Sequence, residues 1–151
     1  MFPVDPPLAV VAEQVRVACD VHRGHDRTGS QPEHTWLTIL NNFSDPVALF
    51  DCKLRHVYVN EATARATNIP SERFRGKSMS DLGHPPEICD QINRNIEGVF
   101  ESGEERGIEL LFEGPDGPVH YECRMMPEWS DDDANVQYVI VISRPKRVAG
   151  G

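Results

Sequence analysis

Histidine and aspartate side chains gather near the N-terminal end of the chain, where they could ligate a metal ion. His22, His25 and His34 share one stretch of sequence with Asp20 and Asp26. Imidazole nitrogens and carboxylate oxygens are both zinc ligands, but structural zinc sites usually space their ligands in compact pairs. The spacing here matches no such pattern. We therefore interpret these residues as a solvated helix end and linker, and we expect no metal site.

Acidic side chains offer a second candidate site. Asp131, Asp132 and Asp133 could bind a cation through their carboxylate oxygens. A short acidic run between two predicted strands is more typical of a solvated hairpin tip, which is the interpretation we adopt. The enzyme patterns GxSxG, HExxH, Walker A and GxGxxG are all absent from the sequence. We expect no catalytic activity.

The four cysteines, Cys19, Cys52, Cys89 and Cys123, lie far apart and form no CxxC pair. This spacing argues against a zinc ribbon and against a thioredoxin-like redox motif. The N-terminus lacks the basic start and apolar core of a secretion signal, and no apolar run reaches the ~18 residues of a membrane span. The sequence therefore predicts a cytoplasmic protein with free, half-buried thiols and no membrane contact.

Length and composition predict one soluble domain with an extension. The chain has 151 residues, of which 39% are hydrophobic and 26% charged. Its formal net charge of −9 repels the phosphate backbone of nucleic acids. Direct binding to DNA or RNA is therefore not expected.

The first part of the chain predicts a helical extension. Residues 8–23 place apolar side chains at helical spacing, and residues 24–32 form a polar linker. A second short helix is predicted to begin at Pro32. An isolated helix of this length is marginal in water, so the apolar face of residues 8–23 should pack on a sheet or on a second chain. The predicted division is a helical extension with linker, a domain and a C-terminal tail: 1–34, 35–144 and 145–151.

The next segment reads as strand, turn, strand and helix. Val47–Phe50 and His56–Val59 are short apolar runs separated by a polar turn. Asn60 can cap the small-residue helix predicted over 61–67, because its side chain can accept a backbone N–H. Residues 69–84 predict short helical turns and loop.

A longer helix and three strands complete the predicted domain. Residues 86–103 carry an apolar stripe at helical spacing and end on glycine. Residues 107–112 and 119–125 alternate in polarity on either side of a strong turn signal, 114–117. The final strand is predicted over 136–142. The stripe of the long helix consists of Ile88, Ile92, Ile96, Val99 and Phe100.

The polarity of the strands predicts their positions in the sheet. The first and last strands are apolar at consecutive positions, a pattern typical of strands buried on both faces. They should therefore be neighbours in the middle of the sheet, whereas the alternating strands should lie nearer an edge or be wet on one face. A sheet buried on both sides needs a cover for its second face. The helix of residues 8–23, or a partner chain, could supply it.

The order of these segments resembles that of the PAS family, over roughly residues 35–144. The resemblance is carried by Asp45–Asp51, Val57–Ala62, Phe74–Ser78 and the final Ile142–Arg144. It implies an α+β fold in which a five-stranded antiparallel sheet of order 2-1-5-4-3 has helices on one face, here with an N-terminal helical extension. It also implies a sensory or dimerisation module.

The resemblance bears on cofactors and on the output connection. Flavin-binding photosensors of the family carry a reactive cysteine in an Asn-Cys-Arg-Phe-Leu-type motif, which this chain lacks. Haem-bearing members usually supply histidine from the long helix, and residues 86–103 contain none. Ligation of haem by His56, His84 or His120 is therefore not expected, and the cofactor is left unknown. Many members end in an Asp-Ile-Thr-like segment, whereas here Ser143-Arg144 runs into a proline.

Ligands of PAS sensors bind between the long helix and the inner face of the sheet. On that basis Asn95, if it turns inward, would orient a ligand in an otherwise apolar pocket. A closed core is the alternative. The candidate pocket residues are Ile92, Asn95, Ile96, Leu110, Phe112, Tyr121 and Cys123.

The resemblance and the residues together predict a cytoplasmic PAS sensory module of bacterial type. It would receive a small-molecule or protein signal, form a homodimer through the N-terminal helix and the sheet face, and act on an output domain or partner protein. One alternative is a ligand-free PAS scaffold that only dimerises. Another is a small α+β enzyme with a central pocket, which a deep polar cavity holding an Asp–His pair would favour.

Overall fold

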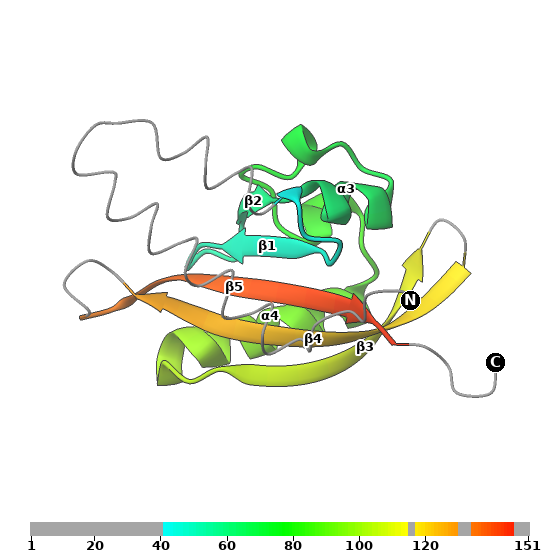
Figure 1. Ribbon diagram of the computed structural model, residues 1–151. Coiled ribbons are helices and arrows are strands. Elements are labelled where there is room, and N and C mark those ends of the chain that lie inside the picture. Colours follow the sequence, from blue (N-terminus) through cyan, green and yellow to red (C-terminus); the bar gives the residue numbers. More distant parts are fainter. Residues whose placement is uncertain (1–40, 115–116, 130–133, 147–151) are drawn as a thin grey trace, which may run out of the picture.

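A five-stranded antiparallel sheet forms the centre of the fold, with strand order β2-β1-β5-β4-β3 (Figure 1). The computed structural model describes residues 41–114, 117–129 and 134–146. This strand order confirms the order implied by the resemblance to PAS domains. The strands are β1 (Val47–Phe50), β2 (His56–Val59), β3 (Arg106–Gly114), β4 (Gly117–Trp129) and β5 (Val136–Pro145).

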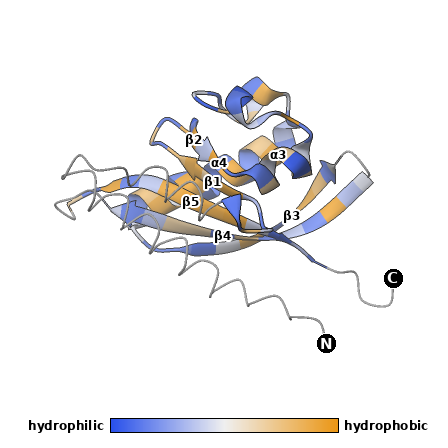
Figure 2. Cartoon of the chain, turned by 45° about the horizontal axis from the view of Figure 1, so that its top comes forward, coloured by the Kyte–Doolittle hydropathy of each residue, from blue (hydrophilic) through white to orange (hydrophobic). Residues whose placement is uncertain are grey.

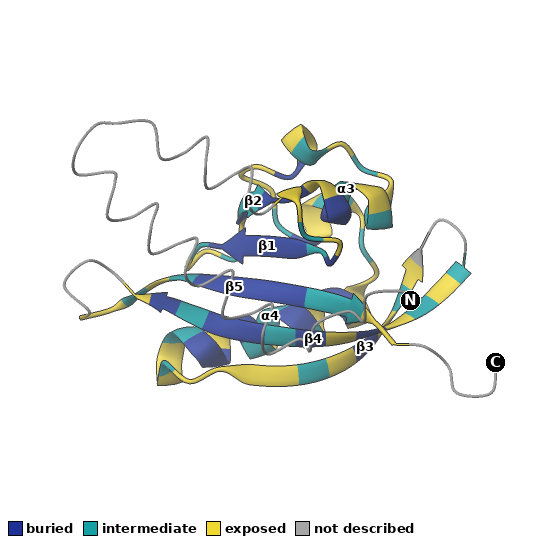
Figure 3. Cartoon of the chain, viewed as in Figure 1, coloured by how far each residue is buried: buried dark blue, intermediate teal, exposed yellow. Residues whose placement is uncertain are grey.

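The first and last strands lie side by side in the middle of the sheet, as their polarity predicted. Val47 pairs with Ile142, and Leu49 pairs with Ile140. Hydrophobic residues follow one another along both strands (Figure 2), and β1 and the centre of β5 are buried (Figure 3). The two strands are apolar at consecutive positions because the side chains on both faces of each strand are buried.

Strands β3 and β4 also take their predicted places, although they are longer than predicted. They begin and end beyond 107–112 and 119–125 and pair continuously from Arg106 with Met125 to Gly114 with Gly117. β3 lies at the edge of the sheet, and its exposed residues face solvent (Figure 3). The alternating polarity of β3 therefore correctly predicted an edge strand with one solvent-exposed face.

Two α-helices lie on one face of the sheet, here called the inner face. α3 spans Glu61–Thr67 and α4 spans Pro86–Ser102, with the short 3-10 turns η1 (Ser71–Arg73) and η2 (Ser80–Leu82) between them. α4 ends as predicted, because Gly103 adopts the left-handed conformation with φ 71°. Its stripe packs on the sheet in the hydrophobic core.

Asn60 joins the first strand to α3. Its side-chain oxygen accepts from the backbone N–H of Thr63 at 3.2 Å and from that of Val47 at 2.9 Å. Its amide nitrogen donates to the carbonyl oxygen of Asp45 at 3.1 Å. The side chain is fully buried. The predicted helix cap is therefore also a buried bridge between α3 and the start of β1.

The opposite face of the sheet, the outer face, is apolar as well. The apolar side chains of this face come from β1, β4 and β5, lie opposite one another on paired strands and are at most 4% exposed. They are buried although α3 and α4 both lie on the inner face. The predicted cover for this face, the helix of residues 8–23 or a partner chain, lies outside the described residues and stays a prediction. The outer-face residues are Val47, Leu49, Met126, Ile140 and Ile142.

Several sequence predictions fall outside the described residues. These are the helix of residues 8–23 with its linker, the second short helix, the histidine and aspartate group near the N-terminus, and the acidic run 131–133. They stay predictions. Within the described ranges, no helix is both long enough and apolar enough to cross a membrane.

Candidate ligand-binding site

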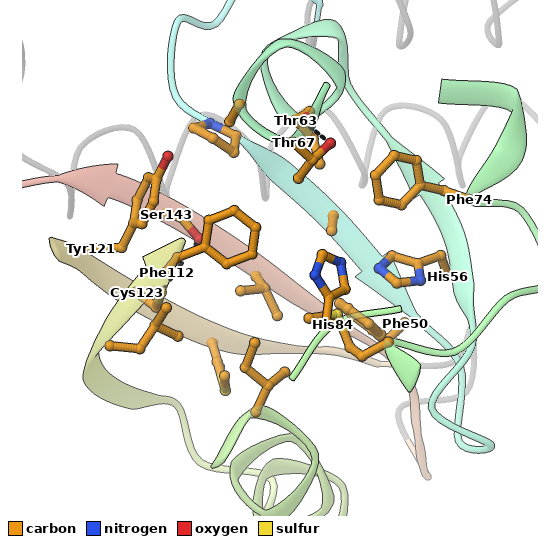
Figure 4. Close-up of a pocket in the computed structure, with 18 residues that line it drawn as sticks. Phe50, His56, Thr63, Thr67, Phe74, His84, Phe112, Tyr121, Cys123 and Ser143 are labelled. Carbon is orange, nitrogen blue, oxygen red and sulfur yellow. Dashed lines mark hydrogen bonds between the residues drawn. The ribbon is translucent and has the colours of Figure 1, made fainter. Parts of the chain in front are cut away.

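A cavity of about 110 Å³ lies between the inner face of the sheet, α3 and α4 (Figure 4). Most of its surface is contributed by aliphatic and aromatic side chains, and the polar atoms come from a few histidine, hydroxyl and thiol groups. This is the composition of a small-molecule site. The lining residues are Pro46, Ala48, Phe50, His56, Thr63, Ala66, Thr67, Phe74, Met79, His84, Ile92, Leu110, Phe112, Tyr121, Cys123, Met125, Val141 and Ser143.

The structure brings five of the seven predicted pocket residues to this cavity: Ile92, Leu110, Phe112, Tyr121 and Cys123. One comes from α4 and four from β3 and β4. They meet because the period-two alternation of the strands directs Leu110, Phe112, Tyr121 and Cys123 to the inner face. That face is the one covered by α4.

The other two predicted residues are not in the lining. Ile96 lies one turn beyond Ile92, where α4 packs directly on the sheet, and it is 0% exposed in the core. Asn95 does not turn inward: its amide donates to the carbonyl oxygen of Gln91 at 2.7 Å, and its oxygen accepts from Arg106 at 3.2 Å. Successive side chains on a helix point about 100° apart, so Asn95 lies on the flank of α4 while Ile96 faces the sheet.

Sequence reasoning missed the α3 and β2 side of the cavity. Thr63, Ala66 and Thr67 all line it, at the i, i+3, i+4 spacing that places residues on one helix face. His56 pairs across the strands with Phe50, so both side chains point to the inner face. The helix spacing and the strand alternation could have identified these residues, but the expected pocket was confined to the long helix and the last strands.

His56 is 3% exposed, which makes it the most buried of the histidine and hydroxyl groups of the cavity. Its Nδ1 lies 2.7 Å from the carbonyl oxygen of Lys77, and its ring packs against Phe50 and Phe74 with centroid distances of 4.4 and 5.1 Å. Burial lowers the pKa of His56 from its ordinary value, and the nearby His84 lowers it further, while the Lys77 carbonyl opposes the change. The neutral imidazole is therefore favoured.

His84 lies beside His56 at the same end of the cavity (Figure 4). It precedes the two prolines that open α4, and its ring packs 5.4 Å from that of Phe112. Partial burial lowers the pKa of His84 as well. Within the described part of the chain neither ring nitrogen of His84 has a hydrogen-bond partner. Two neutral imidazoles thus form the polar end of an apolar cavity.

The thiols near the cavity are not arranged as nucleophiles. The Cys123 sulfur lies 3.3 Å from the Ser143 hydroxyl, and burial raises the pKa of that thiol. Burial also raises the pKa of Cys89 on α4. Both changes favour the protonated, unreactive form. No group of three or more histidine, cysteine, aspartate or glutamate side chains that could hold a metal occurs in the described ranges.

The family of this chain follows from a sequence match that covers most of its length. The family model described as the PAS fold matches residues 40–145. The chain belongs to the PAS fold family. No curated protein matches this PAS domain by sequence.

Solved structures share the fold at low identity. VqmA bound to DPO matches with a TM-score of 0.68 and 14% identity, over 76% of this PAS chain and 57% of that chain. The Vibrio cholerae VqmA dimer matches with a TM-score of 0.68 and 15% identity, over 75% of this chain and 52% of that chain. The Cronobacter turicensis RpfR quorum-sensing receptor PAS domain in complex with BDSF matches with a TM-score of 0.58 and 14% identity, over 70% of this chain and 97% of that chain. This chain thus spans about half the length of the VqmA chains, and the likeness concerns the fold.

Proposed function

We propose that this PAS domain is a sensory module that binds a small, largely apolar molecule in the cavity between α3, α4 and the inner face of the sheet. The observation that carries the proposal is the cavity itself, about 110 Å³ of space lined mostly by aromatic and aliphatic side chains, with two histidines at one end and a few hydroxyl and thiol groups elsewhere. A mostly apolar surface of this kind binds a small molecule by burying it, while the polar groups fix its orientation.

Two proteins of the same fold support a sensing role. One structure is described as VqmA bound to DPO, and another as a quorum-sensing receptor PAS domain in complex with BDSF. A signal received here would pass to an output domain or a partner protein. The match to only 57% of the VqmA chain shows that such folds occur beside further segments.

The proposal includes a homodimer, a cytoplasmic setting and no catalysis. The apolar outer face would be covered by the helix of residues 8–23, which would also support dimerisation. The net charge of −9 disfavours direct contact with nucleic acid, so a nucleic-acid target would have to be reached through another domain. A scaffold that dimerises without any ligand is the second candidate.

The test is to identify a molecule carried by the purified protein. The protein is denatured, and the released small molecules are analysed by mass spectrometry beside an absorbance spectrum of the folded protein. We expect a small apolar or aromatic compound, and no visible band from flavin or haem. A stoichiometric visible chromophore would contradict the expectation on cofactors, and a converted product would favour the enzyme alternative.

A cavity-filling variant distinguishes a sensor from a ligand-free scaffold. Ala66 lines the cavity from α3, whereas Ala64 on the same helix does not. Ala66→Leu should abolish binding of the released compound with little loss of stability, because it fills empty space. Ala64→Leu, a matched control, should keep binding. If the Ala66 variant binds as well as the wild type, the ligand lies elsewhere and the proposal fails.

A further inference from the structure

At the histidine end of the cavity, the donors of His56, Thr63 and Thr67 are engaged with protein groups, which limits what this end can recognise. The imidazole of His56 points toward His84, and its Nδ1 lies 2.7 Å from the Lys77 carbonyl oxygen (Figure 4). A carbonyl can only accept, so Nδ1 carries the proton and the neutral ring has its lone pair on Nε2. In the described residues no group donates to this Nε2. His56 therefore presents an acceptor to the cavity.

The threonines of α3 present acceptors for the same reason. The Thr67 hydroxyl donates to the carbonyl oxygen of Thr63 at 2.8 Å. The Thr63 hydroxyl can donate to the Val47 carbonyl at 3.1 Å or to the Asn60 side-chain oxygen at 3.0 Å. Each hydroxyl has one proton, which these contacts use, and it retains acceptor lone pairs. The hydroxyl of Tyr121 is directed away from the two histidines (Figure 4).

At the histidine end of the cavity, acceptors therefore outnumber free donors. A neutral His84 adds one N–H and one further acceptor nitrogen. Lysine, arginine, aspartate and glutamate do not occur among the described lining residues. An anion would bring more acceptors to a site that has few donors and no fixed positive charge, and a cation would find no counter-charge. Either ion would lose its hydration without compensation.

We propose that the ligand is an uncharged ring compound that carries an N–H or O–H donor, and that Nε2 of His56 accepts its hydrogen bond. The inference rests on the proposed sensing function, because it names the ligand class of the same cavity. The phenyl rings of Phe50, Phe74 and Phe112 pack on the apolar part of the ligand, and the His84 ring lies beside the polar part.

The size of the cavity agrees with one ring. An apolar cavity of about 150 Å³ admits benzene, and the space here is about 110 Å³. The space is the smaller of the two, so a single six-membered ring with one small substituent is the upper limit, whereas a fused or long-chain compound requires the walls to move.

Phenol, toluene and benzoate form a matched set of probes. Phenol and toluene differ in a hydroxyl against a methyl group of similar size, and benzoate adds a negative charge. Their binding to the full chain is measured by calorimetry at pH 7.5. A buried hydrogen bond should make phenol bind roughly tenfold more tightly than toluene, and benzoate should bind most weakly.

His56→Phe tests the residue that accepts the bond. Loss of Nδ1 leaves the Lys77 carbonyl satisfied, because it also accepts from the backbone N–H of His56 at 2.9 Å. In this variant the preference for phenol over toluene should fall below about twofold. His120→Phe, at an exposed position of β4, serves as the control and should keep the preference. In the wild type, phenol should shift the ¹⁵N signal of His56 Nε2, a measurement that needs no variant.

The outcomes separate the two proposals. Equal binding of phenol and toluene, tighter binding of benzoate, or a His56 Nε2 signal that does not move would overturn the donor inference while leaving the cavity as the ligand site. If none of the three probes binds, both the inference and the sensing function of the cavity are contradicted.

Discussion

At the scale of single residues, two polar side chains buried near opposite ends of β1 have different roles. Asn60 is fully buried, and both the oxygen and the nitrogen of its side-chain amide form hydrogen bonds with backbone groups, so its role is structural. His56 is almost as buried, but one of its ring nitrogens has no donor among the described residues. A buried polar atom left open toward a cavity is the kind of group that a ligand can satisfy.

The stability of the protein should fall between pH 7.5 and pH 5.5 because of His56 and His84. Burial lowers the pKa of both groups below 6.5 in the folded protein. Above pH 6.5 both histidines are mostly neutral in the folded and in the unfolded protein, so they contribute little to the pH dependence. Below this pH the unfolded chain takes up protons that the folded chain resists, so the free energy of unfolding decreases until the folded pKa is reached. Urea unfolding across this range should show a smaller decrease in His56→Phe, and an unchanged one in His120→Phe. An equal decrease in the wild type and His56→Phe would contradict the assignment.

Asn60→Ala should destabilise the fold by roughly 3 kcal/mol, since it removes a helix cap and leaves buried groups of Val47 and Asp45 without their partner. Chemical denaturation with circular dichroism measures the change. Asn42→Ala, at an exposed position before β1, is the control and should lie within about 0.5 kcal/mol of the wild type. A loss for Asn60→Ala no larger than that of the control would show that water replaces the bridge.

At the scale of elements, the end of α4 is fixed by a glycine and a tryptophan. Gly103 adopts a left-handed conformation, and a Cβ placed there would lie 2.7 Å from the ring of Trp129 on β4. The close approach lies where α4 ends and the chain turns toward β3, so a glycine at this position lets the end of the helix pack against Trp129.

Gly103→Ala should therefore cost more than an alanine at a left-handed glycine with free space around it. Gly83, with φ 85°, serves as the matched control, because a Cβ added to it would have nothing within 4 Å. We expect about 1 kcal/mol for Gly83→Ala from backbone strain alone. Gly103→Ala should cost about 1–3 kcal/mol more, from overpacking against Trp129. Thermal unfolding of both variants measures the difference, and equal costs would mean that the Trp129 ring moves aside freely.

At the scale of the whole molecule, the sheet is apolar on both faces. The inner face carries the cavity and is covered by α3 and α4. The five outer-face residues form a contiguous apolar patch, which an isolated sheet would expose to solvent. The outer face is therefore the surface through which assembly and signal output are expected to act on the sheet.

Deletion of residues 1–30 should weaken the dimer or lower solubility, because it removes the predicted helix of residues 8–23. The oligomeric state is measured by analytical ultracentrifugation, and stability by thermal unfolding. Substitution of two charged residues in the same predicted helix, Glu13→Gln and Arg16→Gln, is the control for changes in charge. An unchanged oligomeric state and melting temperature after the deletion would refute the role of this segment.

The sequence by itself determined most of the elements from residue 47 onward and the adjacency of the first and last strands, and the family resemblance supplied the full strand order. The apolar runs of Val47–Phe50 and 139–142 placed two strands in mid-sheet, and Asn60 and Gly103 marked the ends of helices. These features are local, because burial on both faces, helix capping and a left-handed turn each select residue types at fixed positions.

Only the tertiary structure decided which side chains share the cavity. His56 and His84 are far apart in the sequence and belong to different elements, and their proximity depends on how the loop after α3 returns over β2. Asn95 and Ile96 have the residue types of a pocket, yet a rotation of about 100° per residue takes one to the flank of α4 and the other into the closed core. A cavity is set by the packing of several elements at once, so no short segment of sequence contains it.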